Sequence, residues 1–234
     1  PTYLLVTEDG GVLRDATSVW GSDTEVTNDS LEAQEGPGAI AASIGPAGEN
    51  GVLFANIICG GKRPGAAGRG GLGAVMGSKN LKAIVARGER KTTLAREDEL
   101  RSYLKEKRGA LREGAAALTS HGTPILVKMI NARGMLCTHN ASQETFEHAD
   151  DISGELIKEH YVVKNSSCHG CPVACGKTVR VPHGEYGGRV MKMPEYETIY
   201  AMGPMLDNRD IVSIINGNGV CDLMGIDTIS MGVT

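Results

Sequence analysis

The chain has 234 residues, of which 41% are hydrophobic, and its 24 Lys and Arg against 28 Asp and Glu give a formal net charge of -4. This length allows one large domain or two smaller ones, and the apolar fraction is sufficient for a core. The mild acidity argues against a general attraction to nucleic acid or to an anionic membrane. No apolar run approaches the roughly 18 residues that span a bilayer, so we expect no transmembrane segment.

The first part of the chain has the pattern of short strands and tight turns. We expect strands over 3–6 and 12–13, joined by a turn at 8–11 that contains Gly10 and Gly11. A polar helix is predicted over 22–35. Strands over 39–45 and 51–59 should flank a turn at 45–48, and a further strand is predicted over 81–86.

The second part has a helical period. Leu100, Leu104 and Leu111 predict a helix with a charged outer face, and Thr123-Pro124 begins another that ends at Gly134. Further helices are expected over 151–163, 194–206 and 210–224. The sequence therefore predicts an α+β fold, with a β-rich domain over 1–90 and a mainly α-helical domain over 91–234.

Three of the six cysteines form a compact motif, Cys168-His-Gly-Cys171-Pro-Val-Ala-Cys175. Three thiols this close cannot all pair as disulfides, but they can converge on one metal centre. A C-x2-C-x3-C loop with Gly and Pro favours a [4Fe–4S] cluster, while a zinc site and three structural cysteines are the alternatives. Such a cluster needs a fourth ligand, for which Cys221, Cys137, His169 or a cysteine beyond Thr234 are the candidates.

The densest glycine tract runs over 66–79 and contains Arg69, with Lys79 close by. Exposed backbone amides beside an arginine suit an anionic ligand such as a phosphate. The tract lacks a Walker A pattern, and it matches G-x-G-x-x-G by letter without the buried strand that the dinucleotide motif requires. A flexible loop is the plain alternative.

Several of these segments together resemble one family. The string AGRGGLGAVMGSKNLKAI over 67–84, the segments SIGPAGEN over 43–50 and PEYET over 194–198, the cysteine motif and DTIS over 227–230 are similar to the aldehyde:ferredoxin oxidoreductases. That resemblance implies a β-rich base domain for a tungsten or molybdenum bis-pterin, followed by helical domains with one [4Fe–4S] cluster. It also implies a fragment, lacking the first part of the β domain and the C-terminal domain.

The resemblance assigns roles to particular residues. Cys168, Cys171 and Cys175 match three cluster ligands, and the fourth in the family comes from a later motif that has no second copy here. The segment from Asp222 through Gly225 to Asp227 is similar to the family's D-x-x-G-L-(C/D) pterin motif, with Ile226 in place of Leu. The residues expected to bind the cofactor are Arg69, Gly70, Gly71, Gly73, Asp222, Gly225 and Asp227.

The implied activity is oxidation of aldehydes to carboxylic acids, with electrons passed through the cluster to ferredoxin or a similar acceptor. A carboxylate near the metal would accept the proton, and we expect Glu197 in this role, with Glu195 as the second choice. A solvated glutamate favoured by the helix dipole is the alternative. The implied setting is cytoplasmic, as a homodimer or with electron-transfer subunits. Two other functions stay open: the catalytic subunit of a tungsten-dependent aromatic acyl-CoA reductase, and a non-catalytic iron–sulfur electron-transfer module.

Overall fold

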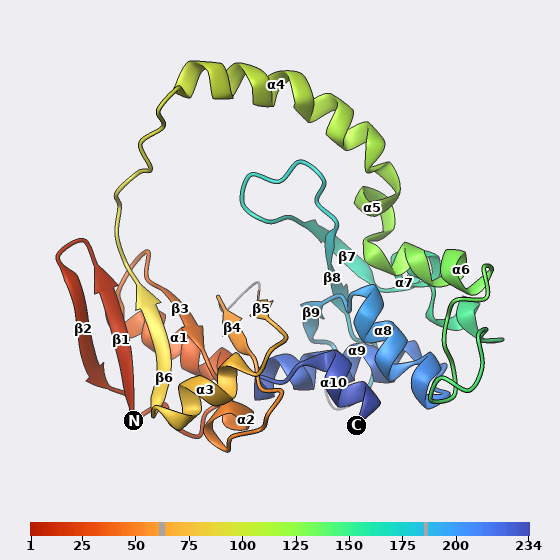
Figure 1. Cartoon of the computed structure of the whole chain (residues 1–234), viewed down its shortest axis with the longest axis horizontal. Coiled ribbons are helices and arrows are strands. Elements are labelled where there is room, and N and C mark those ends of the chain that lie inside the picture. Colours follow the sequence, from red (N-terminus) through yellow and green to blue (C-terminus); the bar gives the residue numbers. More distant parts are fainter. Residues whose placement is uncertain (61–63, 185–186) are drawn as a thin grey trace. The chain divides into compact units, whose positions relative to one another are not determined.

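The computed structural model describes residues 1–60, 64–184 and 187–234 (Figure 1). The chain divides into two compact units, each of which we describe by itself. The first unit contains Pro1–Lys91 and Gly219–Met231, and the second contains Thr92–Asn218 and Gly232–Thr234. None of the helices in the described ranges combines the length and the apolar character that crossing a bilayer needs.

The first unit is built on a mixed sheet. Within the described part of the unit six strands pair in the order β2-β1-β6-β3-β4-β5, with β1 and β6 parallel and the other neighbours antiparallel. Their bounds are β1 Thr2–Thr7, β2 Gly10–Asp15, β3 Ile40–Ser43, β4 Ile57–Cys59, β5 Gly65–Ala67 and β6 Leu81–Ala86. The predicted hairpin and the strand over 81–86 are therefore confirmed. The strand expected over 51–59 is shorter than predicted, since only its last three residues pair.

Helix α1 (Thr24–Glu35) covers one face of this sheet. Asp23 caps its N-terminus by accepting a hydrogen bond from the Val26 amide at 2.8 Å. Leu31 is buried from this helix, and it belongs to a core that is formed by Tyr3, Leu5, Ala16, Val19, Leu31, Ala39, Ala41, Ala83 and Val85. On the sheet, alternate residues such as Ile40 and Ile84 are exposed instead, as the two-residue period of a strand requires.

A short helix, α2 (Pro46–Glu49), replaces the turn predicted at 45–48. Pro46 at the first helical position supports helix entry, so the same residues that signal a turn also begin a helix. The helix ends on Glu49, which forms a buried ion pair with Lys82 of β6. Lys82 also donates to the Ser22 carbonyl at 2.9 Å, and the Gly21 amide donates to Glu49 at 2.8 Å. This network ties α2 to the sheet and to the loop before α1.

The second unit is mainly helical. Its α-helices are α4 Glu97–Gly114, α5 Ala116–His121, α6 Leu126–Asn131, α7 Gly154–His160 and α8 Tyr196–Met202, and α9 Ile211–Met224 enters the first unit from Gly219. In the described part of this unit, 3-10 turns lie at Thr123–Ile125, Ala149–Ile152 and Pro204–Leu206. The final helix of the chain, α10 (Thr228–Val233), belongs mostly to the first unit. Helix α4 follows the predicted period, although it has no buried residue.

A three-stranded antiparallel sheet in this unit was not predicted. It consists of β7 (Val162–Ser166), β8 (Gly176–Arg180) and β9 (Val190–Lys192), in that order. The helix expected over 151–163 ends at His160, because the β-branched pair Val162 and Val163 already belongs to β7. The cysteine motif therefore lies in the loop that joins two paired strands, β7 and β8.

Candidate functional site

The glycine-rich loop joins β5 to helix α3 (Leu72–Ser78) in the first unit. A Cβ atom at Gly71 would collide with the Leu53 carbonyl oxygen, and one at Gly73 with that of Asn56. At Gly70, where φ is +96°, a Cβ would meet open space. The absent side chains of Gly71 and Gly73 therefore let two stretches of the chain's own backbone touch, which is a packing reason for glycine beside the expected contact with a cofactor.

The segment that follows α9 lies against the same loop. The Asn56 amide donates to the Gly225 carbonyl at 2.8 Å, and the Asp227 amide donates to the Phe54 carbonyl at 3.1 Å. Gly225 has φ +72°, and a Cβ there would approach the Gly45 nitrogen to 2.8 Å. The Asp222–Asp227 motif therefore packs against residues 45–56, which precede the loop in the sequence. It contacts the loop itself through the Arg69–Asp227 pair, whose partners lie 158 positions apart.

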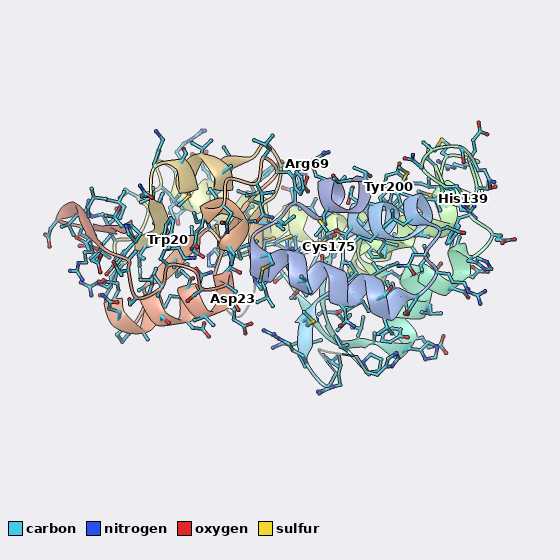
Figure 2. The ribbon with its side chains drawn as sticks, turned by 90° about the horizontal axis from the view of Figure 1, so that it is seen from below. Trp20, Asp23, Arg69, His139, Cys175 and Tyr200 are labelled. Carbon is cyan, nitrogen blue, oxygen red and sulfur yellow. The ribbon has the colours of Figure 1, made fainter. Side chains whose placement is uncertain are left out.

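Arg69 and Asp227 meet in an ion pair, with Nε 3.2 Å from Oδ2. The two partners differ in burial: the side chain of Asp227 is 5% exposed, whereas that of Arg69 is 65% exposed. Asp227 also caps α10, since it accepts from the Ile229 amide at 3.2 Å and from the Ser230 hydroxyl at 2.6 Å. The Arg69 guanidinium is held at Nε by Asp227, while most of its side chain is exposed (Arg69 is labelled in Figure 2).

These residues fit an anionic pterin cofactor. An arginine held at Nε can present its outer nitrogens to a phosphate in a forked geometry. The next residue in the sequence is Gly70, where a Cβ would meet open space. The buried Asn56 side chain adds an oxygen that has no hydrogen-bond partner among the described residues, and a pterin ring offers N–H donors. Asp222 contributes its main-chain carbonyl to the frame, accepting from Thr24 Oγ1 at 2.7 Å.

The cysteine loop lies in the second unit, between β7 and β8. All three thiols are free; Cys168 and Cys171 are exposed and Cys175 is half-buried. A turn closes between the first two, because the Cys171 amide donates to the Cys168 carbonyl at 3.1 Å. The donor set fits an iron–sulfur cluster, which takes thiolate ligands. In the described ranges, however, no three Cys, His, Asp or Glu side chains gather closely enough to hold a metal.

The other candidate ligands have different surroundings. Cys221 is buried in α9. Burial is the main cause that raises the pKa of its thiol to about 12, and the negative charges of Asp222 and Asp227 contribute less. This environment is typical of a structural thiol and not of a thiolate ligand. Cys137 is half-buried, and His169 is exposed in the cysteine loop.

The two candidate glutamates lie at the start of α8. Glu195 is the N-cap residue and is half-buried, and its Oε2 accepts a 2.5 Å hydrogen bond from Thr123 Oγ1. The same hydroxyl accepts from the Tyr196 amide at 3.0 Å, so Thr123 and Glu195 together fix the helix start. Glu197 is exposed in the first turn. The carboxylate of Glu197 is therefore the more accessible of the two.

Two tyrosine rings near these glutamates were not predicted. Tyr196 and Tyr200 stack with their ring centroids 6.4 Å apart. Burial raises the pKa of Tyr196, and the neighbouring Tyr200, Glu197 and Cys137 raise it further. The i, i+4 spacing on α8 was the available signal, because it places both rings on one side of the helix.

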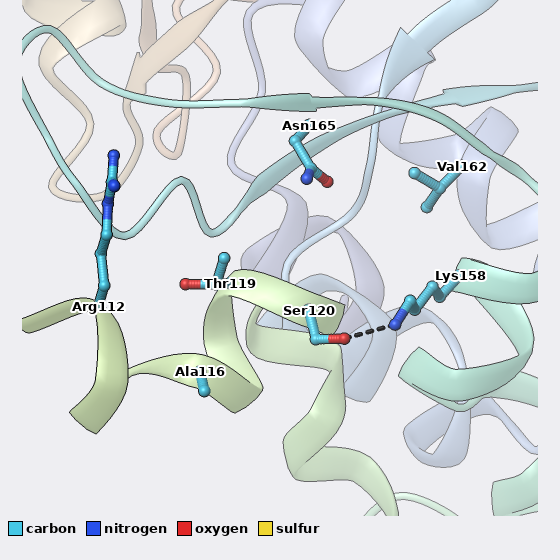
Figure 3. A pocket seen from close by; sticks show the side chains of 7 residues that line it. All are labelled: Arg112, Ala116, Thr119, Ser120, Lys158, Val162 and Asn165. Carbon is cyan, nitrogen blue, oxygen red and sulfur yellow. Dashed lines mark hydrogen bonds between the residues drawn. The ribbon is translucent and has the colours of Figure 1, made fainter.

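An open pocket of about 490 Å³ lies in the second unit and was not predicted (Figure 3). Lys158, which lines the pocket together with Arg112, donates to Ser120 there at 2.5 Å. One of its walls is Thr119, whose hydroxyl donates to the Val173 carbonyl of the cysteine loop at 2.7 Å. Thr119 therefore lines the pocket and also holds the cysteine loop.

Comparison with known proteins identifies the family. The model of the aldehyde ferredoxin oxidoreductase N-terminal domain matches residues 1–88, and the model of domains 2 and 3 of the same family matches residues 99–234. The chain belongs to the aldehyde ferredoxin oxidoreductase family. Its relatives are oxidoreductases, and the resemblance carried by the loop, the cysteines and the Asp222–Asp227 motif is confirmed at the level of the family.

Individual relatives of this family member give the scale of the similarity. It is 41% identical over 239 residues to the tungsten-containing aldehyde ferredoxin oxidoreductase of Pyrococcus abyssi, and 41% identical over 238 residues to that of Thermococcus kodakarensis. In both cases all of the chain aligns with 38% of the relative. It is also 31% identical to the WOR-like subunit of an aliphatic sulfonate oxidoreductase from Pyrococcus furiosus, over 99% of the chain and 39% of that protein.

A solved structure shares the fold. The active-site complex BamBC of benzoyl coenzyme A reductase, bound to 1,5-dienoyl-CoA, superposes with a TM-score of 0.63 over 97% of this chain and 36% of that chain. The sequence identity is 23%, so this likeness concerns the fold. The mixed α and β architecture of the family member is confirmed by this comparison.

Proposed function

We propose that the protein oxidises aldehydes to carboxylic acids at a tungsten or molybdenum bis-pterin centre and passes electrons through a [4Fe–4S] cluster to ferredoxin. The observation that carries the proposal is the Arg69–Asp227 pair, which presents an anchored guanidinium beside the glycine-rich loop. The 41% identity to tungsten-containing aldehyde ferredoxin oxidoreductases supports the same function. We place the protein in the cytoplasm, acting without nucleic acid or membrane, as a homodimer or with electron-transfer subunits.

Different residues of this chain would hold the pterin and the iron–sulfur cluster. Arg69 would bind the phosphate of the pterin, and Gly70 would allow the phosphate to approach. Asp222, Gly225 and Asp227 would hold the backbone around the cofactor in place through their contacts with Thr24 and with residues 54–56. Gly71 and Gly73 would keep the loop packed on the chain. Cys168, Cys171 and Cys175 would ligate the cluster. When bound, the metal–pterin centre supplies the two-electron oxidation and the cluster carries electrons singly.

Glu197 would take the proton released when the aldehyde hydrate is oxidised. Its carboxylate is exposed, whereas that of Glu195 is occupied by the Thr123 hydroxyl. A general base must come within hydrogen-bond reach of the proton that it removes, and the exposed Glu197 carboxylate is accessible to a substrate. The stacked Tyr196 and Tyr200 would form an apolar wall for the substrate on the same helix.

The test is aldehyde oxidation by the full-length protein and two matched variants. Glu197→Gln should lower kcat by about 10²- to 10⁴-fold, as expected for loss of a general base, and should keep the tungsten and iron contents. Glu195→Gln keeps an amide oxygen for Thr123 and should retain most of the activity. Full activity in Glu197→Gln would remove that residue from the mechanism.

Metal contents and turnover of other substrates, measured on the same protein, separate the other functions. Iron without tungsten or molybdenum, and no turnover, would indicate the electron-transfer module. Turnover of an aromatic acyl-CoA in place of aldehydes would indicate the reductase, whose fold the chain shares with BamBC. Reduction of ferredoxin by aldehyde would support the proposed acceptor.

A further inference from the structure

A buried lysine lies directly after the cysteine motif. Lys177 of β8 is 1% exposed, and its main chain is held in the sheet, where its carbonyl accepts from the Met193 amide at 3.0 Å. A fully buried ammonium requires several acceptors to replace the water that it loses. The acceptors around Lys177 therefore show which segments its ammonium group holds together.

The acceptors of Lys177 are main-chain carbonyl oxygens from two segments. Its Nζ lies 3.0 Å from the oxygen of Ala174, 3.2 Å from that of Cys175 and 3.4 Å from that of Gly176. A fourth carbonyl, that of Thr119, lies at 2.9 Å. Thr119 belongs to the last turn of α5, where helix carbonyls lack partners within the helix. One ammonium thus joins the C-terminal end of the cysteine motif to the end of α5.

The backbone at this end of the motif has an unusual conformation. Ala174 has φ +51°, a left-handed conformation that non-glycine residues adopt rarely. Such a conformation persists only where its surroundings determine it. Here three successive carbonyls, from Ala174 to Gly176, accept from the same Nζ atom. These hydrogen bonds hold Ala174 in its left-handed conformation.

Neighbouring contacts hold the same end of the motif. Thr119 Oγ1 donates to the Val173 carbonyl at 2.7 Å, and a Cβ at Gly122 would approach the Cys175 oxygen to 2.8 Å. Cys175 is accordingly half-buried, whereas Cys168 and Cys171 are exposed. The two ends of the motif are therefore unequal: the Cys175 end is built into the unit, and the other end lies on its surface.

We propose that Lys177 is a positioning residue that pre-forms the Cys175 side of the cluster site, so that the cluster binds first to a fixed Cys175 and is then closed by Cys168 and Cys171. A planar peptide directs its N–H away from its C=O. Drawing the Ala174 carbonyl toward Nζ therefore turns the Cys175 amide, which precedes β8, the other way, where its N–H group can stabilise a cluster sulfide. The proposal rests on the proposed [4Fe–4S] cluster at these cysteines.

The experiment compares Lys177→Met, Lys177→Gln and the control Lys164→Met in the full-length protein. Lys164 is exposed on the neighbouring strand β7, so its replacement removes a positive charge without touching the motif. The primary measurements are the rate at which a chelator removes iron and the EPR spectrum of the reduced cluster. A further measurement needs no cluster: hydrogen exchange of the 173–177 amides in the iron-free protein.

Lys177→Met should speed iron loss by about ten- to a hundredfold, the loss expected when one or two hydrogen bonds to a charged donor disappear, and should alter the EPR spectrum. Exchange of the 173–177 amides should rise in parallel. Lys177→Gln retains an amide donor and should be intermediate, whereas a role through charge alone makes Gln and Met equal. Lys164→Met should match the wild type.

Unchanged iron release, EPR spectrum and amide exchange in Lys177→Met would overturn the proposal, and so would equal effects in Gln and Met. If Lys177→Met does not fold, Lys177→Gln and Thr119→Val, which removes the bond to Val173, carry the same comparison. A wild-type protein that binds no iron would refute the cluster and the proposed function. Faster amide exchange in the iron-free variants would still support the role of Lys177 in shaping the loop.

Discussion

Replacement of Asp227 by alanine tests the local structure of the loop region most sharply. Asp227 is almost fully buried and accepts hydrogen bonds from the Ile229 amide, the Ser230 amide at 3.3 Å and the Ser230 hydroxyl. Its fourth donor is Arg69. Asp227→Ala removes all four interactions, so the start of α10 and the orientation of Arg69 lose their common anchor.

The expected cost follows from these contacts. Loss of the N-cap costs about 1 kcal/mol, and loss of the buried charged hydrogen bond to the Ser230 hydroxyl costs about 1.5 kcal/mol. The pair with Arg69 adds less than about 0.5 kcal/mol, because solvent screens an arginine whose side chain is 65% exposed. A total of about 2–3 kcal/mol corresponds to a rise in local opening of about 30- to 150-fold.

Hydrogen exchange of the Ile229 and Ser230 amides in the full-length protein measures this opening directly. Asp227→Asn keeps an acceptor oxygen and should raise exchange by about tenfold or less. Asp210→Ala is the matched control, since Asp210 caps α9 through the Val212 amide at 2.9 Å and makes no contact with α10 that the structure shows. Exchange in Asp227→Ala equal to that of the wild type would refute the assigned hydrogen bonds.

Three further substitutions have defined outcomes. Lys82→Met leaves the buried Glu49 unpaired and should lower the free energy of unfolding by about 3–5 kcal/mol in chemical denaturation, whereas Lys82→Met with Glu49→Leu should recover most of it. Gly77→Ala places a methyl group against the Gly48 carbonyl and should reduce cofactor content together with thermal stability; an unchanged Tm would contradict that close packing. Cys221→Ser should leave iron content and EPR signal unchanged, and loss of the signal would make Cys221 a ligand.

The elements that the sequence predicts well are those with a strong local signal. The hairpin of β1 and β2 follows from alternating apolar residues around Gly10, and α1 from the capping Asp23. Helix α4 follows from its period, although a period cannot show that the apolar side of the helix stays exposed. The strands β7 to β9 are only three to five residues long and do not alternate regularly between apolar and polar residues, so their pairing depends on tertiary context that no window of sequence contains.

The candidate site was predicted in part. The sequence indicates Arg69 and Asp227 separately, but their contact joins residues 158 positions apart and depends on the fold. It assigns the glycines to ligand binding, but it cannot show that a Cβ at Gly71 would also collide with the Leu53 carbonyl, because that contact depends on the fold. The role of Lys177 was missed, because one lysine in a strand gives no signal that it is buried.

The central claim, that the glycine-rich loop holds a metal–pterin cofactor through Arg69, is tested most directly by cofactor content. Tungsten, molybdenum and released pterin should be measured in the full-length wild-type protein, in Arg69→Ala and in Lys79→Ala, whose exposed lysine lies at the end of α3. We expect pterin and one of the two metals in the wild type and in Lys79→Ala, and a marked loss of both in Arg69→Ala. A wild-type protein without pterin, or an Arg69→Ala variant with full pterin content, would contradict the claim.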